Sequence, residues 1–422
     1  MWRSILLGAA LGLLSSAEAR AQHPEPPRLL DDIRFLSDDG LKGRMTGSPG
    51  ADSAASYLAR RFSQVGLQPA AGGWFQPFTV GREASAARQG QGAVVGMNVI
   101  GILPGHDPVL RNQTVVLGAH YDHLGVGGFG SLDPDSTGKV HNGADDNASG
   151  AAALIQVAAR LATSPPARTV VFIAFSGEEL GLLGSAYYVK QPIYPLSSTL
   201  AMVNLDMVGR LRNGRLIVYG ARTAKEFPAL LDSLNWYAGF DLKAQGDGYG
   251  PSDHSSFYAV KRPVLHLFTD LHEDYHRSTD DWQKLNYDGL KRVADFSLGL
   301  VTALANRTRP LTFLDLPAPT ATKATSSGPD SPGYGAYLGT VPDMTGAPGG
   351  VRLVGVRAGS PAEKAGLRGD DIITRIGRSE TPDLQAMTDA LRSHKPGEIV
   401  EIVVRRGASV TTLRATLGER GG

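Results

Sequence analysis

Acidic and histidine side chains recur in short clusters, and each cluster follows or interrupts an apolar run of the sequence. The first cluster is His120-Tyr121-Asp122, which comes directly after the apolar residues 114–117. A histidine two positions from a carboxylate can bind a metal ion while the carboxylate orients its ring. Taken alone, the pair fits a polar loop at the end of a strand better than a functional site.

Two further clusters carry adjacent carboxylates. Asp145 and Asp146 stand before the predicted helix 149–163, where one would cap the helix and the other would favour the positive end of its dipole. Glu178 and Glu179 follow a strongly apolar run. Because neighbouring carboxylates at the mouth of a buried strand repel each other, a cation or an acid/base role explains them better than a solvated charge pair.

The last two clusters supply one carboxylate and one histidine. Asp206 lies within the apolar run 202–208, where an unpaired carboxylate is expensive to bury, so a ligand role is favoured over a surface role. His276 stands in a polar loop after the apolar run 263–268, with Tyr275 beside it. Together the clusters hold the nitrogen and oxygen donors that suit a pair of Zn²⁺ ions with open positions for water.

The composition excludes other kinds of site. The chain of 422 residues contains no cysteine, so disulfides and thiolate ligands are excluded and any metal must be held by His, Asp and Glu. Its 42 basic and 41 acidic residues are interspersed and give a formal net charge of +1, which argues against nucleic acid or an anionic membrane as a partner. Length and composition predict a globular protein of two or more domains.

The elements that must position these clusters are predicted by apolar runs that alternate with amphipathic stretches over residues 27–306. This alternation predicts an α/β domain, a sheet covered by helices, and sites in such folds form where the strands end. The clearest strands are predicted at residues 98–103, 114–117, 169–175, 200–205, 215–219 and 263–268. Helices are predicted at residues 51–65, 149–163, 224–237 and 288–305.

Three other segments differ in composition. Residues 1–21 combine an early arginine, an apolar run and the small-x-small sequence Ala19-Arg20-Ala21, which predict a signal peptide and export to the periplasm or the extracellular medium. That apolar run is shorter than the roughly 20 residues that span a bilayer, and no membrane span is expected after signal removal. Residues 307–333 are rich in Pro, Thr, Ser and Gly, which predicts a linker, and a smaller domain is expected over residues 334–419.

The ordered clusters closely resemble the motifs of the co-catalytic zinc aminopeptidases, whose relatives include glutamate carboxypeptidase and glutaminyl cyclase. The resemblance covers about residues 29–305, and the matching segments are Gly43 to Ser48, His120-x-Asp122, residues 143–150, Glu178-Glu179, Asn204-Leu205-Asp206 and Tyr275-His276. It implies a zinc exopeptidase-like fold with a mixed central sheet flanked by helices. It also implies two zinc ions, with Asp146 bridging them, His120 and Asp206 completing one site, and Glu179 and His276 completing the other.

The resemblance also implies roles in catalysis. Glu178 would be the general base, which takes a proton from a metal-bridging water as it attacks the scissile carbonyl and passes that proton to the leaving amine. Asp122 would orient His120. Tyr275 is similar in position to a tyrosine that donates to the oxyanion in some members of the family.

Several other polar residues have weaker claims. Asp253 and His254 resemble a family segment that lines the pocket, and we expect them on the substrate side or behind the ligands rather than among them. His266, inside an apolar strand, is expected to be a core histidine. The remaining candidates, expected to be loop residues without a role at the site, are His123, His141 and His272.

The second domain resembles a PDZ domain of the kind found in bacterial periplasmic proteases. The resemblance rests on residues 337–340, 351–356 and 359–373. It implies that Tyr337, Leu338 and Gly339 form a loop whose backbone N–H groups bind a C-terminal carboxylate, with a helix over residues 384–391 as the other wall of the groove. A small β-rich packing domain without a ligand is the alternative.

The predicted function is therefore that of an exported zinc metallo-aminopeptidase that removes N-terminal residues from peptide or protein substrates. A carboxypeptidase on the same metal site stays open, because Arg210, Arg212 and Arg277 could recognise the other terminus. An acyltransferase of glutaminyl cyclase type uses a single zinc in this scaffold, and the presence of both ligand pairs argues against it. A catalytically inert peptide-binding protein is a further alternative, although no ligand position is missing.

Overall fold

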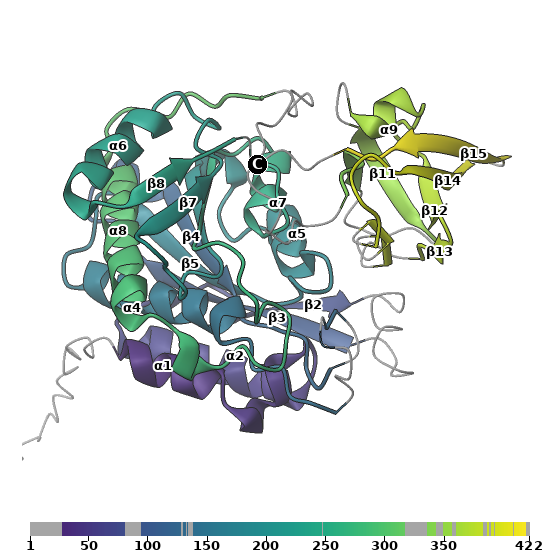
Figure 1. Ribbon diagram of the computed structural model, residues 1–422. Helices are drawn as coiled ribbons and strands as arrows, with labels where there is room; N and C mark the ends of the chain where they lie inside the picture. Colours follow the sequence, from purple (N-terminus) through teal and green to yellow (C-terminus); the bar gives the residue numbers. More distant parts are fainter. Residues whose placement is uncertain are drawn as a thin grey trace, which may run out of the picture.

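The computed structural model describes residues 28–80, 94–127, 130–131, 133, 138–246, 248–316, 336–342, 349–356, 360–382, 386–387, 390–391, 393–407 and 409–418 (Figure 1). The predicted signal peptide lies outside the described residues, and so do residues 317–333 of the predicted linker. The strands of the described chain form two sheets.

The larger sheet has nine strands among the described residues, in the order β1-β3-β5-β4-β6-β9-β7-β8, with β2 paired to β3. Its centre is parallel, since β4 pairs in parallel with β5 and β6, and β6 with β9. Antiparallel pairs flank that centre, at β3–β5 and β7–β9. The bounds are β1 Gln68–Pro69, β2 Phe75–Val80, β3 Val94–Leu103, β4 Thr114–His120, β5 Thr169–Phe175, β6 Thr199–Leu205, β7 Arg215–Tyr219, β8 Asp241–Ala244 and β9 Val264–Phe268.

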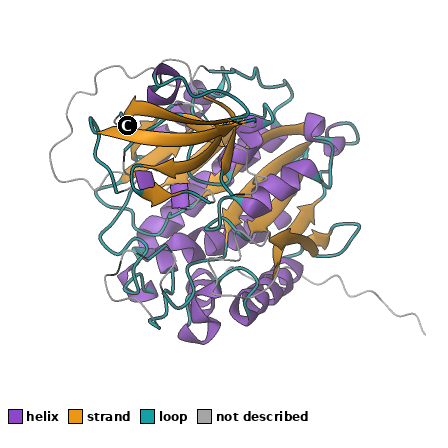
Figure 2. Cartoon of the chain, turned by 90° about the vertical axis from the view of Figure 1, so that its right-hand side faces the viewer, coloured by secondary structure: helices purple, strands orange, loops and turns teal. Residues whose placement is uncertain are grey.

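Helices cover both faces of this sheet (Figures 1 and 2). Alternate strand residues point to opposite faces, so Val115 and Leu117 pack into the core formed with α1, α2, α4, α6 and α8, whereas Val116 packs with α5 and α7 on the other side. The bounds are α1 Leu29–Leu36, α2 Pro49–Gln64, α4 Gly150–Ala162, α5 Leu183–Lys190, α6 Phe227–Ala238, α7 His254–Ala259 and α8 Tyr287–Asn306.

Local sequence explains where the long helices begin. The hydroxyl of Ser48 accepts a hydrogen bond from the backbone N–H of Ala51 at the start of α2, and Pro49 occupies the first helical position. The side chain of Asn286 caps α8 in the same way through the N–H of Gly289. Helix α4 is buried on nearly every side, which matches its run of alanine and aliphatic residues.

The parallel register brings three strand ends to one edge of the sheet. His120 at the end of β4 pairs with Phe175 at the end of β5, and Gly118 of β4 pairs with Asn204 of β6. The carboxyl end of β9 joins them, because Asn204 also pairs with His266. The acidic and histidine clusters of the sequence therefore start from neighbouring points on this edge.

The second sheet has the strand order β10-β11-β12-β14-β15, with β13 paired to β12, and it packs around its own apolar cluster, which includes Leu353, Ile373 and Ile402. The predicted wall helix is described only in part, with residues 386–387 and 390–391 helical. The bounds are β10 Thr340–Pro342, β11 Val351–Val356, α9 Pro361–Lys364, β12 Ile372–Ile376, β13 Ser379–Glu380, β14 Ile399–Arg406 and β15 Ser409–Thr416.

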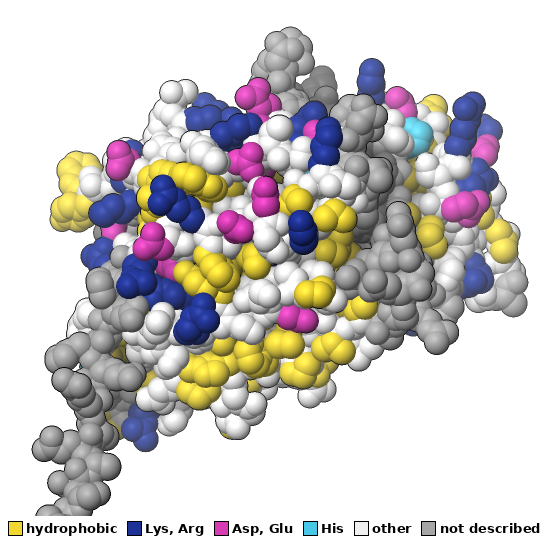
Figure 3. Space-filling model, turned by 90° about the horizontal axis from the view of Figure 1, so that it is seen from below, with side chains coloured by type: hydrophobic (Ala, Val, Ile, Leu, Met, Phe, Trp, Pro, Cys, Tyr) yellow, Lys and Arg dark blue, Asp and Glu magenta, His cyan; other side chains and the backbone are white. Residues whose placement is uncertain are grey.

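The fold class predicted from the sequence is confirmed: a mixed α/β sheet with flanking helices, followed by a β-rich region. The short elements α1, α5, α7, β1, β2 and β8 were not predicted. None of the helices in the described part of the chain has both the length and the apolar character that a membrane crossing requires. Basic and acidic side chains are interspersed over the face seen in Figure 3, as the balanced composition predicts.

Candidate metal centre

The five side chains predicted to bind metal lie together at the carboxyl edge of the sheet. Asp146 stands between two histidines: its Oδ1 is 3.2 Å from His120 Nε2, and its Oδ2 is 3.2 Å from His276 Nε2. His120 Nε2 also lies 3.3 Å from Asp206 Oδ1, and His276 Nε2 lies 3.3 Å from Glu179 Oε2. The result is two groups of donor atoms that share one carboxylate.

The spacing of these donor atoms fits zinc. A tetrahedral Zn²⁺ ion with ligand bonds of about 2.0 Å separates its ligand atoms by about 3.3 Å. The four separations above, 3.2 to 3.3 Å, match that edge length. Two more side chains lie close to these groups. A carboxylate oxygen of Glu178 lies within 4.8 Å of donor atoms of His120 and Asp206, and a ring nitrogen of His123 lies within 4.8 Å of donor atoms of Asp146 and Glu179.

The charges of the site favour a cation. Burial would raise the pKa of Asp146, but the hydrogen bonds from His120 and His276 hold that pKa well below its usual value. Burial likewise opposes ionisation of Glu179, yet the charge of His276 lowers the pKa of this carboxyl to about 2. For His276 itself burial would lower the pKa, and Glu179 with Asp146 raises it to about 10. The carboxylates of Asp146 and Glu179 therefore stay ionised despite their burial, because positive charge lies beside them. A bound metal ion would supply such positive charge as well.

Glu178 differs from its neighbour Glu179 in environment. Its side chain is half-buried, and burial raises its pKa well above the usual value, opposed by the charge of His120 and assisted by that of Glu179. Its backbone N–H donates to Asp122 Oδ1 at 3.2 Å. A carboxyl group with a raised pKa beside metal-binding side chains is suited to accepting and releasing a proton.

Asp122 contacts His120 mainly through its backbone. His120 Nδ1 lies 3.2 Å from the carbonyl oxygen of Asp122 and 3.8 Å from its carboxylate oxygen Oδ1. The carboxylate accepts a hydrogen bond from Thr46 Oγ1 at 2.9 Å, and the same hydroxyl accepts the N–H of Gly177 at 2.9 Å. Asp122 thus connects the segment that holds Thr46 to the ends of β4 and β5.

Arg44 was not predicted to act at the site, although it belongs to the matched segment of residues 43–48. Its guanidinium is fully buried and donates to the backbone carbonyls of Tyr121 at 2.7 Å, Asn142 at 2.6 Å and Gly143 at 3.0 Å. Burial lowers its pKa to about 10. Arg44 joins the end of β4, which carries His120, to the segment that leads into Asp146.

Asp145 does not cap helix α4 as one interpretation of the sequence had it. Its Oδ1 accepts the hydroxyl of Ser149 at 3.0 Å and the backbone N–H of Gly209 at 2.6 Å, while its Oδ2 lies 3.2 Å from His272 Nε2. Asp280 reaches the same segment, and its Oδ2 accepts the N–H groups of Asp145 at 2.9 Å and Asp146 at 3.1 Å. These buried carboxylates connect three ligand-bearing segments.

Three histidines lie in loops, as expected, but all of them are buried. His123 is fully buried, and its Nδ1 lies 2.7 Å from Glu179 Oε1. His272 is buried against Asp145. His141 is buried as well, with its Nε2 2.7 Å from the hydroxyl of Ser131. Spacing along the chain gave no signal for the contacts of His123 and His272, because Glu179 and Asp145 are distant from them in sequence.

The remaining candidates at this edge lie close to the ligands. The ring of Tyr275 stacks on that of His276, with centroids 3.9 Å apart and an interplanar angle of 26°.

Ser252 Oγ donates to Asp206 Oδ2 at 2.6 Å, so the segment with Asp253 packs directly behind Asp206. Asp253 is fully buried, and burial raises its pKa to about 7. His266 is buried, as expected of a core histidine, with its ring centroid 4.5 Å from that of His254.

The loop predicted to bind a carboxylate precedes β10. Leu338 is buried and its carbonyl accepts the N–H of Ala362 at 2.8 Å, Tyr337 pairs with Gly418 through backbone hydrogen bonds of 2.8 Å, and Gly339 has a φ of +83°. In the described chain, β10 pairs with β11 alone and forms an edge of its sheet. An edge strand beside such a loop can accept an added strand.

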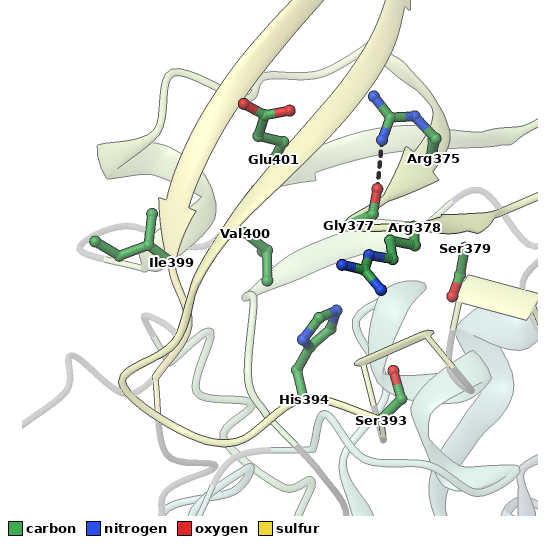
Figure 4. A pocket seen from close by; sticks show the side chains of 9 residues that line it. All are labelled: Arg375, Gly377, Arg378, Ser379, Ser393, His394, Ile399, Val400 and Glu401. Carbon is green, nitrogen blue, oxygen red and sulfur yellow. Dashed lines mark hydrogen bonds between the residues drawn. The ribbon is translucent and has the colours of Figure 1, made fainter.

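A separate cavity of about 560 Å³ lies elsewhere in the second sheet (Figure 4). Its lining includes the guanidinium groups of Arg375 and Arg378, and Arg375 donates to the carbonyl of Gly377. None of the residues predicted to bind metal or a peptide carboxylate lines it. The other lining residues are Ser379, Ser393, His394, Ile399, Val400 and Glu401.

Models of known protein families match both parts of the chain. Residues 98–301 match the model of peptidase family M28, and residues 336–417 match that of the PDZ domain. Leupeptin-inactivating enzyme 1 of Streptomyces exfoliatus is 25% identical over 293 residues, which are 66% of this chain and 58% of that protein. Leucine aminopeptidase 1 of Sclerotinia sclerotiorum is 28% identical over 320 residues, which are 70% of this chain and 79% of that protein.

A solved structure has the same fold. The Zn-dependent exopeptidase of Parabacteroides distasonis superposes with a TM-score of 0.54 at 20% identity, covering 67% of this chain and 99% of that one. The chain spans little more than half the length of the first curated relative above. The family matches therefore identify a peptidase domain of family M28 within the chain and a PDZ domain after it, and the solved structure shares the fold of the first of these domains.

Proposed function

We propose that this enzyme is an exported aminopeptidase that binds two zinc ions. The observation that carries the proposal is the position of Asp146, with each carboxylate oxygen 3.2 Å from a different histidine. A carboxylate placed in this way can serve two cations at once. We assign the larger domain to residues 27–306, the linker to 307–333 and the PDZ domain to 334–419.

The residues present fit zinc in number, chemistry and spacing. Asp146 would be shared, His120 and Asp206 would complete one group, and Glu179 and His276 the other. Zinc bound there would lower the pKa of water towards neutrality and polarise a substrate carbonyl. Both groups have their full set of donors, which favours peptide hydrolysis over an acyltransferase with a single zinc.

Glu178 would move the proton during hydrolysis. Its carboxylate takes the proton of the attacking water and delivers it to the amine that leaves. The backbone N–H of Glu178 donates to Asp122, which holds this peptide unit in place. Tyr275, whose ring stacks on that of His276, would donate its hydroxyl to the developing oxyanion.

The environment of three arginines favours recognition of an amino terminus over a carboxyl terminus. Arg210 donates to the carboxylate of Asp274 and to the carbonyl of Lys284. Arg212 donates to the carbonyl of Leu271, and Arg277 lies 3.7 Å from Asp133. Arg210 is therefore paired with a carboxylate of the chain and Arg277 lies near another, which leaves less positive charge for a substrate carboxylate.

The side chain of the first substrate residue would be apolar. A cluster of buried apolar residues adjoins the metal centre: Met207, Ile217 and Phe268, with Tyr219, Leu271 and Tyr275 packed against it. Met207 follows Asp206 and Tyr275 precedes His276, so the cluster extends directly from two of the proposed ligands. The name of one relative, leucine aminopeptidase, agrees with this preference.

The PDZ domain would bind the C-terminal end of a peptide or protein. Tyr337, Leu338 and Gly339 would supply backbone N–H groups for the carboxylate, and the peptide would pair with the edge strand β10. Export would follow from the signal peptide predicted over residues 1–21, which places the enzyme in the periplasm or the extracellular medium.

Hydrolysis of matched peptides tests the proposal. We expect the purified protein to cleave a short peptide with a free N-terminal leucine and to leave its N-acetylated twin intact. Chelation should abolish that cleavage and zinc should restore it. Equal cleavage of both peptides would replace the aminopeptidase with a carboxypeptidase or an endopeptidase, and cleavage of neither would favour an inert peptide-binding protein.

A further inference from the structure

We propose that His123 is a positioning residue of the second metal group, where its Nδ1–H donates a hydrogen bond to Glu179 and fixes the direction of that carboxylate. The inference rests on the proposed function, since it concerns how one of the proposed zinc ligands is held.

The two carboxylate oxygens of Glu179 have different neighbours: the distance of one fits two ligands on a shared metal ion, and the distance of the other fits a hydrogen bond. Glu179 Oε2 lies 3.3 Å from His276 Nε2, the separation of two ligands on one tetrahedral ion. Glu179 Oε1 lies 2.7 Å from His123 Nδ1, the length of a charge-assisted hydrogen bond. His123 Nδ1 is also 3.9 Å from Asp146 Oδ2, beyond the ligand spacing that the other histidines show. Glu179 therefore uses one oxygen for the metal group and the other for His123.

The imidazole ring of His123 has little freedom to turn. It is fully buried and meets the ring of His276 edge to face, with centroids 5.7 Å apart. A Cβ atom at Gly143 would lie 2.5 Å from Cγ and Cδ2 of His123, so the absence of a side chain at residue 143 makes room for the ring. The backbone N–H of His123 donates to the carbonyl of Arg44 at 3.4 Å, which holds this segment from the other side.

The hydrogen bond also selects a tautomer. Donation from Nδ1 leaves Nε2 as the acceptor nitrogen, and among the described residues Nε2 is buried and has no hydrogen-bond partner. One strand end then serves both groups: His120 provides a donor atom to the first, and His123, three residues later, orients a donor of the second.

The consequence is a measurable effect on metal binding. Removing a hydrogen-bond partner of a metal ligand weakens metal affinity by about 10- to 100-fold. We expect His123→Leu in the full chain to lower the affinity for one of the two zinc ions within this range. His123→Asn should stay within about threefold of the wild type, because an Asn side-chain amide can place an N–H near the position of Nδ1.

The experiment is a zinc titration against a chelator of known affinity, with thermal unfolding of the metal-free protein and the visible spectrum of the Co²⁺-substituted protein as further readouts. His106→Leu and His106→Asn are the matched controls, since His106 is exposed and its Nδ1 lies 2.9 Å from the backbone carbonyl of Pro165, away from the proposed ligands. The expected pattern is one weakened site and an altered Co²⁺ spectrum for His123→Leu, recovery in His123→Asn, and unchanged controls.

Two results would overturn the inference while leaving the proposed function intact. One is a His123→Leu protein that binds both zinc ions as tightly as the wild type. The other is a loss of thermal stability in the metal-free protein that explains the weaker binding and is not reversed by Asn. If the Leu variant does not fold, His123→Gln replaces it, because its longer side chain misplaces the amide N–H. A wild-type protein that binds fewer than two zinc ions would instead contradict the proposed function.

Discussion

The carboxylate of Asp280 accepts the backbone N–H of Asp146 at 3.1 Å. Asp280 stands four positions after His276, so the loop that carries this histidine also holds Asp146 in place. The same oxygen accepts the N–H of Asp145 at 2.9 Å. The geometry of the centre thus depends on a contact between two loops that are distant in sequence.

Replacement of Asp280 by Ala should destabilise the metal-free protein. Two buried N–H groups lose their acceptor, which is worth about 2–4 kcal/mol of unfolding free energy in total. Asp280→Asn keeps an acceptor oxygen and should lose less. Urea unfolding of both variants measures the difference, and equal stability of Asp280→Ala and the wild type would show that these hydrogen bonds do not support the site.

Replacement of Glu178 by Gln separates a general base from a ligand. The amide cannot accept the proton, so kcat should fall by about 10²- to 10⁴-fold while the zinc content stays unchanged. Zinc content is measured on the same samples by elemental analysis. Loss of zinc in Glu178→Gln would make this residue a ligand beside His120 and Asp206, the group within whose reach it lies.

Replacement of Tyr275 by Phe keeps the ring that stacks on His276 and removes only the hydroxyl. If the hydroxyl donates to the oxyanion, kcat should fall by about 10²- to 10³-fold with little change in KM or zinc content. Steady-state kinetics on a leucyl peptide provide the measurement. A variant with wild-type kcat would assign Tyr275 to packing alone.

The PDZ domain should lose stability in acid through Asp371. Burial would raise the pKa of Asp371, but the hydrogen bonds from Arg406, at 2.6 and 2.7 Å, lower it below its usual value. Because the folded pKa is lower than the unfolded one, this pair stabilises the domain above about pH 4, and the stabilisation is lost as the pH falls through the folded pKa.

Hydrogen exchange of the amides in β14 and β15 of the full chain tests this pair. Asp371→Asn should speed exchange at pH 7, because the charged hydrogen bonds to Arg406 are weakened. The difference from the wild type should shrink as the pH falls below the usual aspartate range. Equal exchange of the two proteins at pH 7, or a difference that persists unchanged in acid, would contradict the assignment.

Sequence reasoning predicted the sheet and the ligand-bearing strand ends because those features are local. A buried strand such as residues 169–175 has a continuous apolar pattern, and Glu178 and Glu179 stand out directly after it. The long helices have periodic apolar faces, and the order of the parallel strands brings their ends to one edge. The short helices α5 and α7 have too few turns to produce such a pattern.

Contacts between distant loops could not be predicted in the same way. His123 meets Glu179 across 56 residues, Asp280 meets Asp146 across 134, and Arg44 meets Asn142 across 98. Each of these side chains looks like an ordinary loop residue until the strands are assembled. The sequence identifies donor atoms that follow strands, whereas the residues that hold those donors are found only by their contacts.

The central claim is that Asp146 lies between two zinc ions. Diffraction from crystals of the zinc-loaded protein, collected on both sides of the zinc absorption edge, tests it most directly. We predict two anomalous peaks, one among His120, Asp146 and Asp206 and the other among Asp146, Glu179 and His276. A single peak, or two peaks of which one is remote from Asp146, would contradict the account.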